Sequence, residues 1–124
     1  MKIYFAHSKD FDFKEEYYKP IRNNHKLREH EIFLPHEEEE HSSNSREFYK
    51  KLDIIIAECS FPATGLGIEL GFAYDDRKSI YCLYKKGAKI SGSLNSVTNH
   101  FYEYDGTDEM IKIINKIIED TDEI

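Results

Sequence analysis

The sequence lacks the features that mark nucleic-acid binders and membrane proteins. Its 24 acidic residues outnumber its 17 basic residues and give a formal net charge of -7, whereas a protein that binds duplex DNA or RNA needs a basic face to displace counterions. The longest apolar run, IIIA with its flanks, is far too short to span a bilayer. The N-terminus reaches charged residues within ten positions, so no secretory signal is expected. We therefore expect neither a nucleic-acid polymer nor a membrane as partner, while a small phosphorylated ligand is compatible with this charge.

Cysteine is scarce, and no residues cluster as metal ligands do. Cys59 and Cys82 each lie in a strongly apolar run, which predicts small buried residues and not a disulfide. A reducing cytoplasm is the simplest compartment for such a chain. His36 and His41 stand five apart in a polar stretch without a cysteine pair nearby. We therefore expect no metal site, and we expect no other cofactor.

What the chain does contain is a regular alternation of strand and helix patterns. Its 124 residues suffice for one domain with one core, which we expect to cover residues 1–124. Apolar, β-branched and aromatic runs predict strands at residues 2–7, 31–35, 53–59, 79–85 and 100–105. Helical patterns lie between and after them, at residues 11–30 (interrupted by Pro20), 46–52, 67–77 and 107–120.

This alternation predicts a three-layer α/β fold of the flavodoxin or Rossmann-like type, in which helices flank a five-stranded parallel sheet. Ligands of such sheets bind beyond the carboxyl ends of the strands, where the strand order reverses. The loops after the first, third and fourth strands are therefore the expected ligand loops.

The loop after the third strand leads into the unusual stretch FPATGLGIELGFA, residues 61–73. Its Gly65, Gly67 and Gly71 match neither the dinucleotide fingerprint nor the phosphate-binding P-loop, but they permit a tight turn and a close approach of ligand to backbone. Glu69 is expected in the first turn of the following helix, where free N–H groups favour an ionised carboxylate. Spacing alone favours a helix-start acid, and the alternative is a carboxylate that attacks or stabilises a sugar carbon.

Residues 53–85, DIIIAECSFPATGLGIELGFAYDDRKSIYCLYK, resemble the signature of the nucleoside 2-deoxyribosyltransferase-like family, which includes the 2'-deoxynucleoside 5'-phosphate N-hydrolases. The opening KIYFAHS resembles the first strand of the same family. The resemblance implies that Glu69 is a nucleophile that attacks C1' of a deoxyribose and releases the base. It also implies that Tyr4 borders this nucleophile. The implied function is cleavage or base exchange of an N-glycosidic bond in a 2'-deoxynucleoside or its 5'-monophosphate, through a glycosyl-enzyme intermediate.

The resemblance also implies substrate contacts and a homodimer. Ser8 matches a serine that contacts the 5' end of the nucleotide, and either Ser91 or Ser93 matches a serine that can reach the neighbouring subunit's site. The remaining candidates for substrate contacts lie in the expected ligand loops and the stretch after the second strand, and they are His7, Lys9, His36, Gly65 and Gly67.

Two departures from the family pattern keep alternatives open. The aspartate that protonates the leaving base in the family is absent, because residues 43–45 read Ser-Asn-Ser, and His36, Glu37 or His41 could substitute for it. In the loop after the first strand, Lys9 is the only fixed cation, so a 5'-phosphate is not required by the pattern. The alternatives are a nucleotide-binding module without turnover and an N-glycosidase for another ribosyl substrate.

Overall fold

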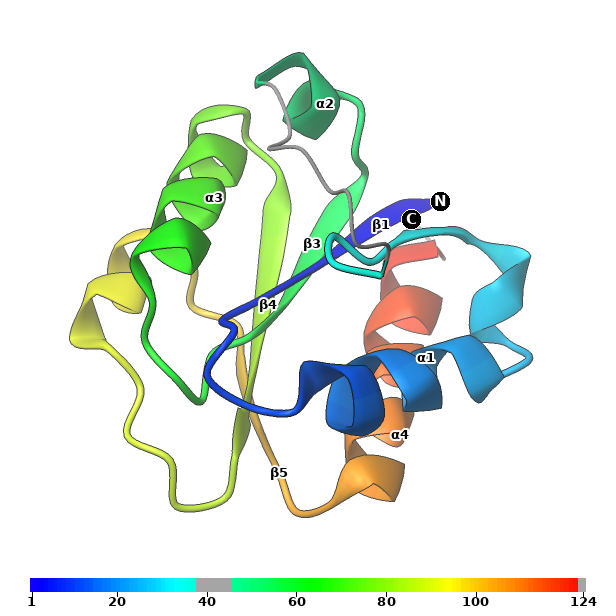
Figure 1. The fold of residues 1–124 in the computed structure, drawn as a ribbon. Coiled ribbons are helices and arrows are strands. Elements are labelled where there is room, and N and C mark those ends of the chain that lie inside the picture. Colours follow the sequence, from blue (N-terminus) through cyan, green and yellow to red (C-terminus); the bar gives the residue numbers. More distant parts are fainter. Residues whose placement is uncertain (38–45, 123–124) are drawn as a thin grey trace.

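The computed structural model describes residues 1–37 and 46–122 and contains the expected parallel sheet (Figure 1). The strands follow one another in the spatial order β2-β1-β3-β4-β5, and every neighbouring pair is parallel. Their bounds are Lys2–His7 for β1, Glu31–Phe33 for β2, Ile54–Glu58 for β3, Ser79–Lys85 for β4 and Phe101–Tyr104 for β5. The predicted fold class is confirmed, with the strand order reversing between β1 and β3.

Helices cover both faces of the sheet (Figure 1). One face carries α2 (Arg46–Lys50) and α3 (Thr64–Asp75), and the other carries α1 (Lys19–Asn23) and α4 (Thr107–Asp122). Shorter turns complete the chain: a π-helical turn η1 (Lys14–Tyr18) that runs into α1, and 3-10 turns η2 (Leu27–Glu29) and η3 (Gly92–Ser96). No helix within the described residues is both long and apolar enough to cross a bilayer.

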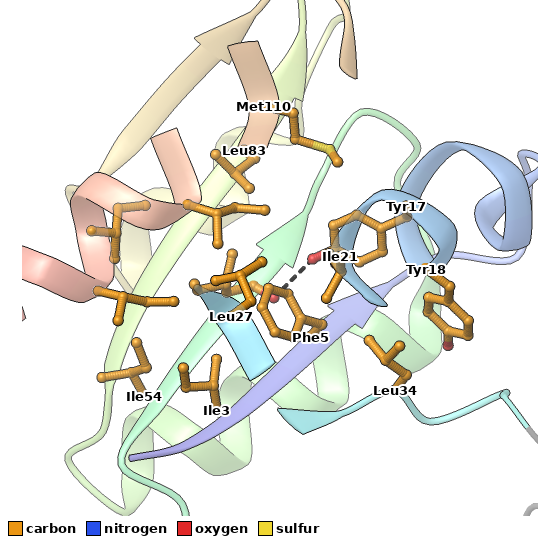
Figure 2. Packing of buried hydrophobic residues seen from close by; sticks show 14 of the residues in the cluster. Ile3, Phe5, Tyr17, Tyr18, Ile21, Leu27, Leu34, Ile54, Leu83 and Met110 are labelled. Carbon is orange, nitrogen blue, oxygen red and sulfur yellow. Dashed lines mark hydrogen bonds between the residues drawn. The ribbon is translucent and has the colours of Figure 1, made fainter. Parts of the chain in front are cut away.

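Side chains that alternate along the central strands divide the interior into two cores. Ile3 and Phe5 of β1 pack on the side of α1 and α4, and Tyr4 and Ala6 pack on the side of α2 and α3. Figure 2 shows the first of these cores, where the Tyr17 hydroxyl donates a hydrogen bond to the Ile56 carbonyl at 3.1 Å. Strand β1 therefore contributes side chains to both cores.

The last helix binds the sheet through the predicted apolar stripe. Met110, Ile114, Ile117 and Ile118 are buried in the first core, and Ile113 is partly buried beside it. Burying such a side chain stabilises the fold by roughly 1.5–3 kcal/mol. The residues that are spaced three and four apart in the sequence therefore form the face of α4 that packs against the sheet.

Proline accounts for two boundaries that differ from the simplest pattern. Pro20 lies in the first turn of α1, where its missing N–H group would have no helical partner, so it separates η1 from α1 without breaking a bond. Strand β2 ends at Phe33, two residues before Pro35, although the pattern extended it to residue 35. In both places a helix or strand begins or ends so that the proline takes no interior position that needs its backbone N–H group.

Candidate functional site

Glu69 lies in the second turn of α3, and the prediction that it lies in the first turn is wrong. The helix begins at Thr64 after an extended Ala63 (φ -152°, ψ 143°), so Glu69 is its sixth residue and the first turn contains no acid. The glycine pair that suggested a loop is helical, because neither Gly65 nor Gly67 adopts a positive φ. The free N–H groups at the helix start therefore do not explain this carboxylate, and other donors must hold it.

Two tyrosines from different elements hold the Glu69 carboxylate. The Tyr4 hydroxyl of β1 donates to Glu69 Oε2 through a short hydrogen bond, and the Tyr49 hydroxyl of α2 donates to the same oxygen at 3.2 Å. Burial, followed by the charge of Glu69, raises the pKa of Tyr4 well above its usual value. Tyr4 therefore stays protonated and remains a donor to the carboxylate. Hydrogen bonds from donors to a charged acceptor are stronger than neutral ones.

Aromatic rings surround this tyrosine pair. Phe48 meets the Tyr4 ring edge-on at 5.7 Å, and Phe33 meets Phe48 in the same way at 5.2 Å. On the other side, Tyr49 lies 5.8 Å from Phe72 of α3. Tyr4 and Tyr49 are both buried among these rings, and hydrogen bonds are electrostatically stronger in such surroundings.

The short helix α2 is fastened to α3 by a charged side chain at its first residue. Arg46 donates to Asp75 at 2.6 Å and to Asp76 at 3.3 Å, and its guanidinium lies 4.6 Å above the Phe72 ring.

Sequence reasoning missed Tyr49. The signal was present, because Tyr49 and Leu52 are three apart in a helical pattern and both are buried, which puts Tyr49 on the inward face.

A second group of predicted residues lies at the end of β1 and forms an internal hydrogen-bond chain. His7 Nδ1 is 2.6 Å from the Ser8 carbonyl oxygen, and His7 Nε2 is 2.5 Å from the Tyr18 hydroxyl. A carbonyl can only accept, so Nδ1 carries the proton and Nε2 accepts from Tyr18. Tyr18 in turn accepts the backbone N–H of His36 at 2.9 Å.

These hydrogen bonds give His7 an internal role, and its contact with a substrate stays a prediction. His7 is 5% exposed, and burial lowers its pKa to about 4. The ring is therefore neutral at neutral pH and offers no positive charge to a phosphate. Ser8 is also buried, and its Oγ accepts the Asp10 backbone N–H at 3.2 Å, whereas Lys9 is exposed.

A third group of predicted residues surrounds a cavity of about 430 Å³ between α3 and the segment around η3. Gly67, Ser91 and Ser93 contribute to its wall, and Glu69 does not. A Cβ atom at Gly67 would meet nothing within 4 Å, so this helix surface is open. Ser91 also caps η3, since its Oγ accepts the Ser93 backbone N–H at 3.3 Å. The predicted site residues thus fall into three separate groups within one chain.

The stretch between β2 and α2 is described only in part. His36 is partly exposed and its ring lies 5.5 Å from that of His7. Glu37 is held by two 2.8 Å hydrogen bonds from Arg22. His41 and residues 43–45 lie outside the described residues. Within residues 1–37 and 46–122, no three histidine, cysteine, aspartate or glutamate side chains are grouped so that they could hold a metal ion.

A buried carboxylate shapes the loop that leads into α3. Glu58 at the end of β3 accepts from the Ser60 backbone N–H at 2.6 Å and from the Ser60 hydroxyl at 2.9 Å. It also accepts a short hydrogen bond from the Tyr104 hydroxyl of β5. Ser60 Oγ then accepts the Lys85 backbone N–H at 2.7 Å. The ends of β3, β4 and β5 are therefore tied together, which fixes where the chain turns toward Glu69.

Comparisons with known proteins lead to enzymes that cleave N-glycosidic bonds. No protein-family model matches the chain. A curated relative, the 5-hydroxymethyl-dUMP N-hydrolase of Tetraodon nigroviridis, is 31% identical over 55 residues, which are 43% of this chain. The match spans only 39% of that relative's length.

A solved structure, the CMP N-glycosidase BcmB of Clostridium botulinum, has the same fold. It aligns with a TM-score of 0.62 over 93% of this chain and 99% of its own, at 19% sequence identity. The curated match is named as an N-hydrolase of a deoxynucleotide and the solved structure as an N-glycosidase, which agrees with the resemblance that the motif indicates.

Proposed function

We propose that this chain cleaves the N-glycosidic bond of a 2'-deoxynucleoside or 2'-deoxynucleoside 5'-monophosphate, with Glu69 as the nucleophile. The observation that carries the proposal is the pair of phenol hydrogen bonds from Tyr4 and Tyr49 to one oxygen of Glu69. A helix-start acid would need no such support. The activities for which the curated relative and the solved structure are named concern the same bond type and support the proposal.

The chemistry proceeds in two steps. A Glu69 oxygen forms a bond to C1' while the C1'–N bond breaks and its electron pair leaves with the base. Water then attacks C1' and loses a proton, which ends on the released base, while the bond to Glu69 breaks and its electron pair returns to the carboxylate. C1' carries positive charge in both transition states, and an ionised carboxylate beside it stabilises that charge. Tyr4 and Tyr49 orient the carboxylate for attack.

Glu69→Gln is expected to abolish turnover while the protein stays folded. Loss of a nucleophile that acts as a unit with its partners costs at least about 10³-fold in kcat. The assay incubates the protein with the common deoxynucleosides and deoxynucleotides and measures free base by chromatography. Glu119→Gln, an exposed acid on α4, is the matched control and should leave the rate unchanged. Equal base release by the wild type and Glu69→Gln would refute the role of Glu69 as the nucleophile.

A nucleotide-binding module without turnover is the second candidate. It is favoured by the Ser-Asn-Ser sequence at residues 43–45, where the family has its proton donor. Calorimetry on the same substrate panel separates the two. Tight binding without base release supports the module, and release of base at any substrate above the Glu69→Gln background contradicts it.

We further propose that the chain forms a homodimer and works in a reducing compartment such as the cytoplasm. We also propose that it exchanges bases when a second base, in place of water, attacks C1' of the glycosyl-enzyme. Ser91 and Ser93 line a cavity whose wall does not include Glu69, and the resemblance assigns this loop to a neighbouring subunit's site. Cys59 and Cys82 are free and buried, which suits a reducing compartment. Light scattering that gives the mass of one chain would contradict the dimer.

A further inference from the structure

The short helix α2 carries Tyr49, one of the two tyrosines that donate to Glu69. It spans five residues, and an isolated helix of this length is not stable in water. Its place beside α3 (Figure 1) therefore depends on contacts with the rest of the chain. Little movement is tolerated, because the Tyr49 hydroxyl is already 3.2 Å from Glu69 Oε2. A further separation of about 0.4 Å would leave no hydrogen bond.

We propose that Arg46 is a positioning residue, which sets Tyr49 against the nucleophile by holding α2 to the C-terminal end of α3. The proposal rests on the proposed function, since it assigns Arg46 to the orientation of Glu69. Arg46 Nη2 donates to Asp75 Oδ2 at 2.6 Å and to Asp76 Oδ1 at 3.3 Å. Charge-assisted hydrogen bonds have a defined geometry, whereas apolar packing is non-directional. Arg46 therefore fixes the place of α2 along α3 more closely than the aromatic contacts of α2 do.

The residues that meet lie in matched order on the facing sides of the two segments. Arg46 and Tyr49 are three apart on α2, which puts them on one side of this helix. Arg46 meets Asp76, just beyond α3, and Tyr49 meets Glu69 within α3. The Phe72 ring of α3 contacts both, at 4.6 Å from the Arg46 guanidinium carbon and 5.8 Å from the Tyr49 ring. A shift of α2 at Arg46 would therefore move the Tyr49 hydroxyl relative to Glu69.

The other end of α2 is tied to the same part of the chain. Lys78, three residues after the end of α3, donates from its Nζ to the carbonyl of Lys50 at 2.8 Å. Lys50 is the last residue of α2, and the last carbonyls of a helix have no partner within the helix. Both ends of α2 are therefore held by residues 75–78.

Stability alone does not account for the Arg46 pair. The Asp76 side chain is 9% exposed, and its Oδ2 is buried without a donor among the described residues. A buried oxygen without a donor costs free energy, and buried ion pairs often add no net stability. Asp75, the other acceptor, is 73% exposed, and exposed ion pairs contribute little as well. What the pair supplies is a defined position for α2.

A double-mutant cycle on kcat separates positioning from a general effect on the fold. Arg46→Gln should lower kcat about 10-fold and change KM less than about twofold, since one hydrogen bond to the Glu69 carboxylate is lost while the substrate still binds. In the Tyr49→Phe background, where the hydroxyl is already absent, the same substitution should change kcat by less than about twofold. Lys51→Gln removes a positive charge at an exposed residue directly after α2. It is the matched control and should leave kcat unchanged.

Arg46→Lys is the rescue variant. Both hydrogen bonds of Arg46 leave from one nitrogen, Nη2, so a single charged donor suffices to hold α2. The kcat of Arg46→Lys should therefore lie within about threefold of the wild type. Asp76→Asn keeps the shape of the acceptor and removes its charge, so it should lower kcat by less than Arg46→Gln. This smaller loss should also vanish in the Tyr49→Phe background.

The carbon-13 signal of the tyrosine Cζ atom gives a readout that needs no turnover, because it responds to the hydrogen bond that the hydroxyl makes. Protein labelled at tyrosine Cζ contains nine such atoms, and the signal that is missing in Tyr49→Phe belongs to Tyr49. Arg46→Gln should move this signal, whereas Lys51→Gln should leave it in place.

Three results would overturn the inference: an unchanged kcat in Arg46→Gln, an equal loss of kcat in the wild-type and Tyr49→Phe backgrounds, or a Tyr49 signal that Arg46→Gln does not move. A wild type that releases no base would refute the proposed function, and the Tyr49 signal would still show whether Arg46 sets the position of Tyr49. Circular dichroism identifies any variant that does not fold, and Arg46→Lys and Asp76→Asn carry the same test if Arg46→Gln is one of them.

Discussion

The two faces of the sheet are built by the same strands but differ in what they bury. On the α1 and α4 face, β1 presents Phe5 to a core closed by the regular stripe of α4. On the α2 and α3 face, the adjacent Tyr4 presents a hydroxyl to a carboxylate. A buried hydroxyl and acid cost free energy unless they are paired. The difference therefore separates a face that stabilises the fold from a face that is arranged for chemistry.

Ile114→Ala should break the stabilising face and leave the chemistry intact. Ile114 is fully buried on α4, and truncation of such a residue costs about 2–5 kcal/mol of unfolding free energy because it leaves a cavity. Urea denaturation measures this loss, and kcat/KM per folded molecule should stay within about twofold of the wild type. A large fall in kcat/KM of the folded protein would show that the faces are not separate.

The dependence of the unfolding free energy on pH should show whether His7, at the end of β1, is buried in its neutral form. Burial lowers the pKa of His7 from 6.5 to about 4, so the unfolded chain binds its proton first as pH falls. Above pH 6.5, His7 in its neutral form contributes about 3 kcal/mol to the free energy of unfolding. This contribution is lost as the pH falls from 6.5 to about 4. Denaturation at pH 7, 5.5 and 4 measures it.

The acidic residues also titrate in this range, so His7→Gln is the reference. The wild type should lose more stability than His7→Gln as pH falls from 7 to 4. Parallel loss in both proteins would mean that His7 is not buried in its neutral form.

Tyr49→Phe should weaken the chemical face with little effect on stability. The ring contacts with Phe48 and Phe72 remain, and the hydrogen bond to Glu69 is lost. A hydrogen bond to a charged group contributes about 1.5–3 kcal/mol, so kcat should fall roughly 10–100-fold while KM changes little. Tyr102→Phe, a partly buried tyrosine at the far edge of the sheet, is the control. Equal kcat in Tyr49→Phe and the wild type would remove Tyr49 from the site.

The strands and the last helix could be predicted because their patterns are local. The runs at β1 and β4 matched to the residue, and the stripe from Met110 to Ile118 identified the face of α4. The start of α3 could not be predicted, because Gly65 and Gly67 read as a turn, while the extended Ala63 and packing of Leu66 set the helix start at Thr64. Tertiary packing overrode the low helix propensity of glycine.

The candidate site was predictable only in part, since its contacts join residues far apart in the chain. The motif indicated Glu69 and Tyr4, and the structure places their side chains in direct contact. Tyr49 carries no motif, and its role depends on how α2 packs against α3. The burial of His7 depends on the aromatic side chains of Phe13 and, in η1, Tyr18, and no single pattern in the sequence reveals these contacts.

The most direct test of Glu69 as nucleophile is capture of the covalent intermediate. A 2'-fluoro analogue of the best deoxynucleotide slows both steps, because the fluorine destabilises positive charge at C1', and the glycosyl-enzyme should accumulate. Mass spectrometry of the quenched protein should show one fluorinated sugar on the peptide that contains Glu69, with one equivalent of base released and no adduct in Glu69→Gln. Continued base release in Glu69→Gln, without an adduct on that peptide in the wild type, would contradict the account.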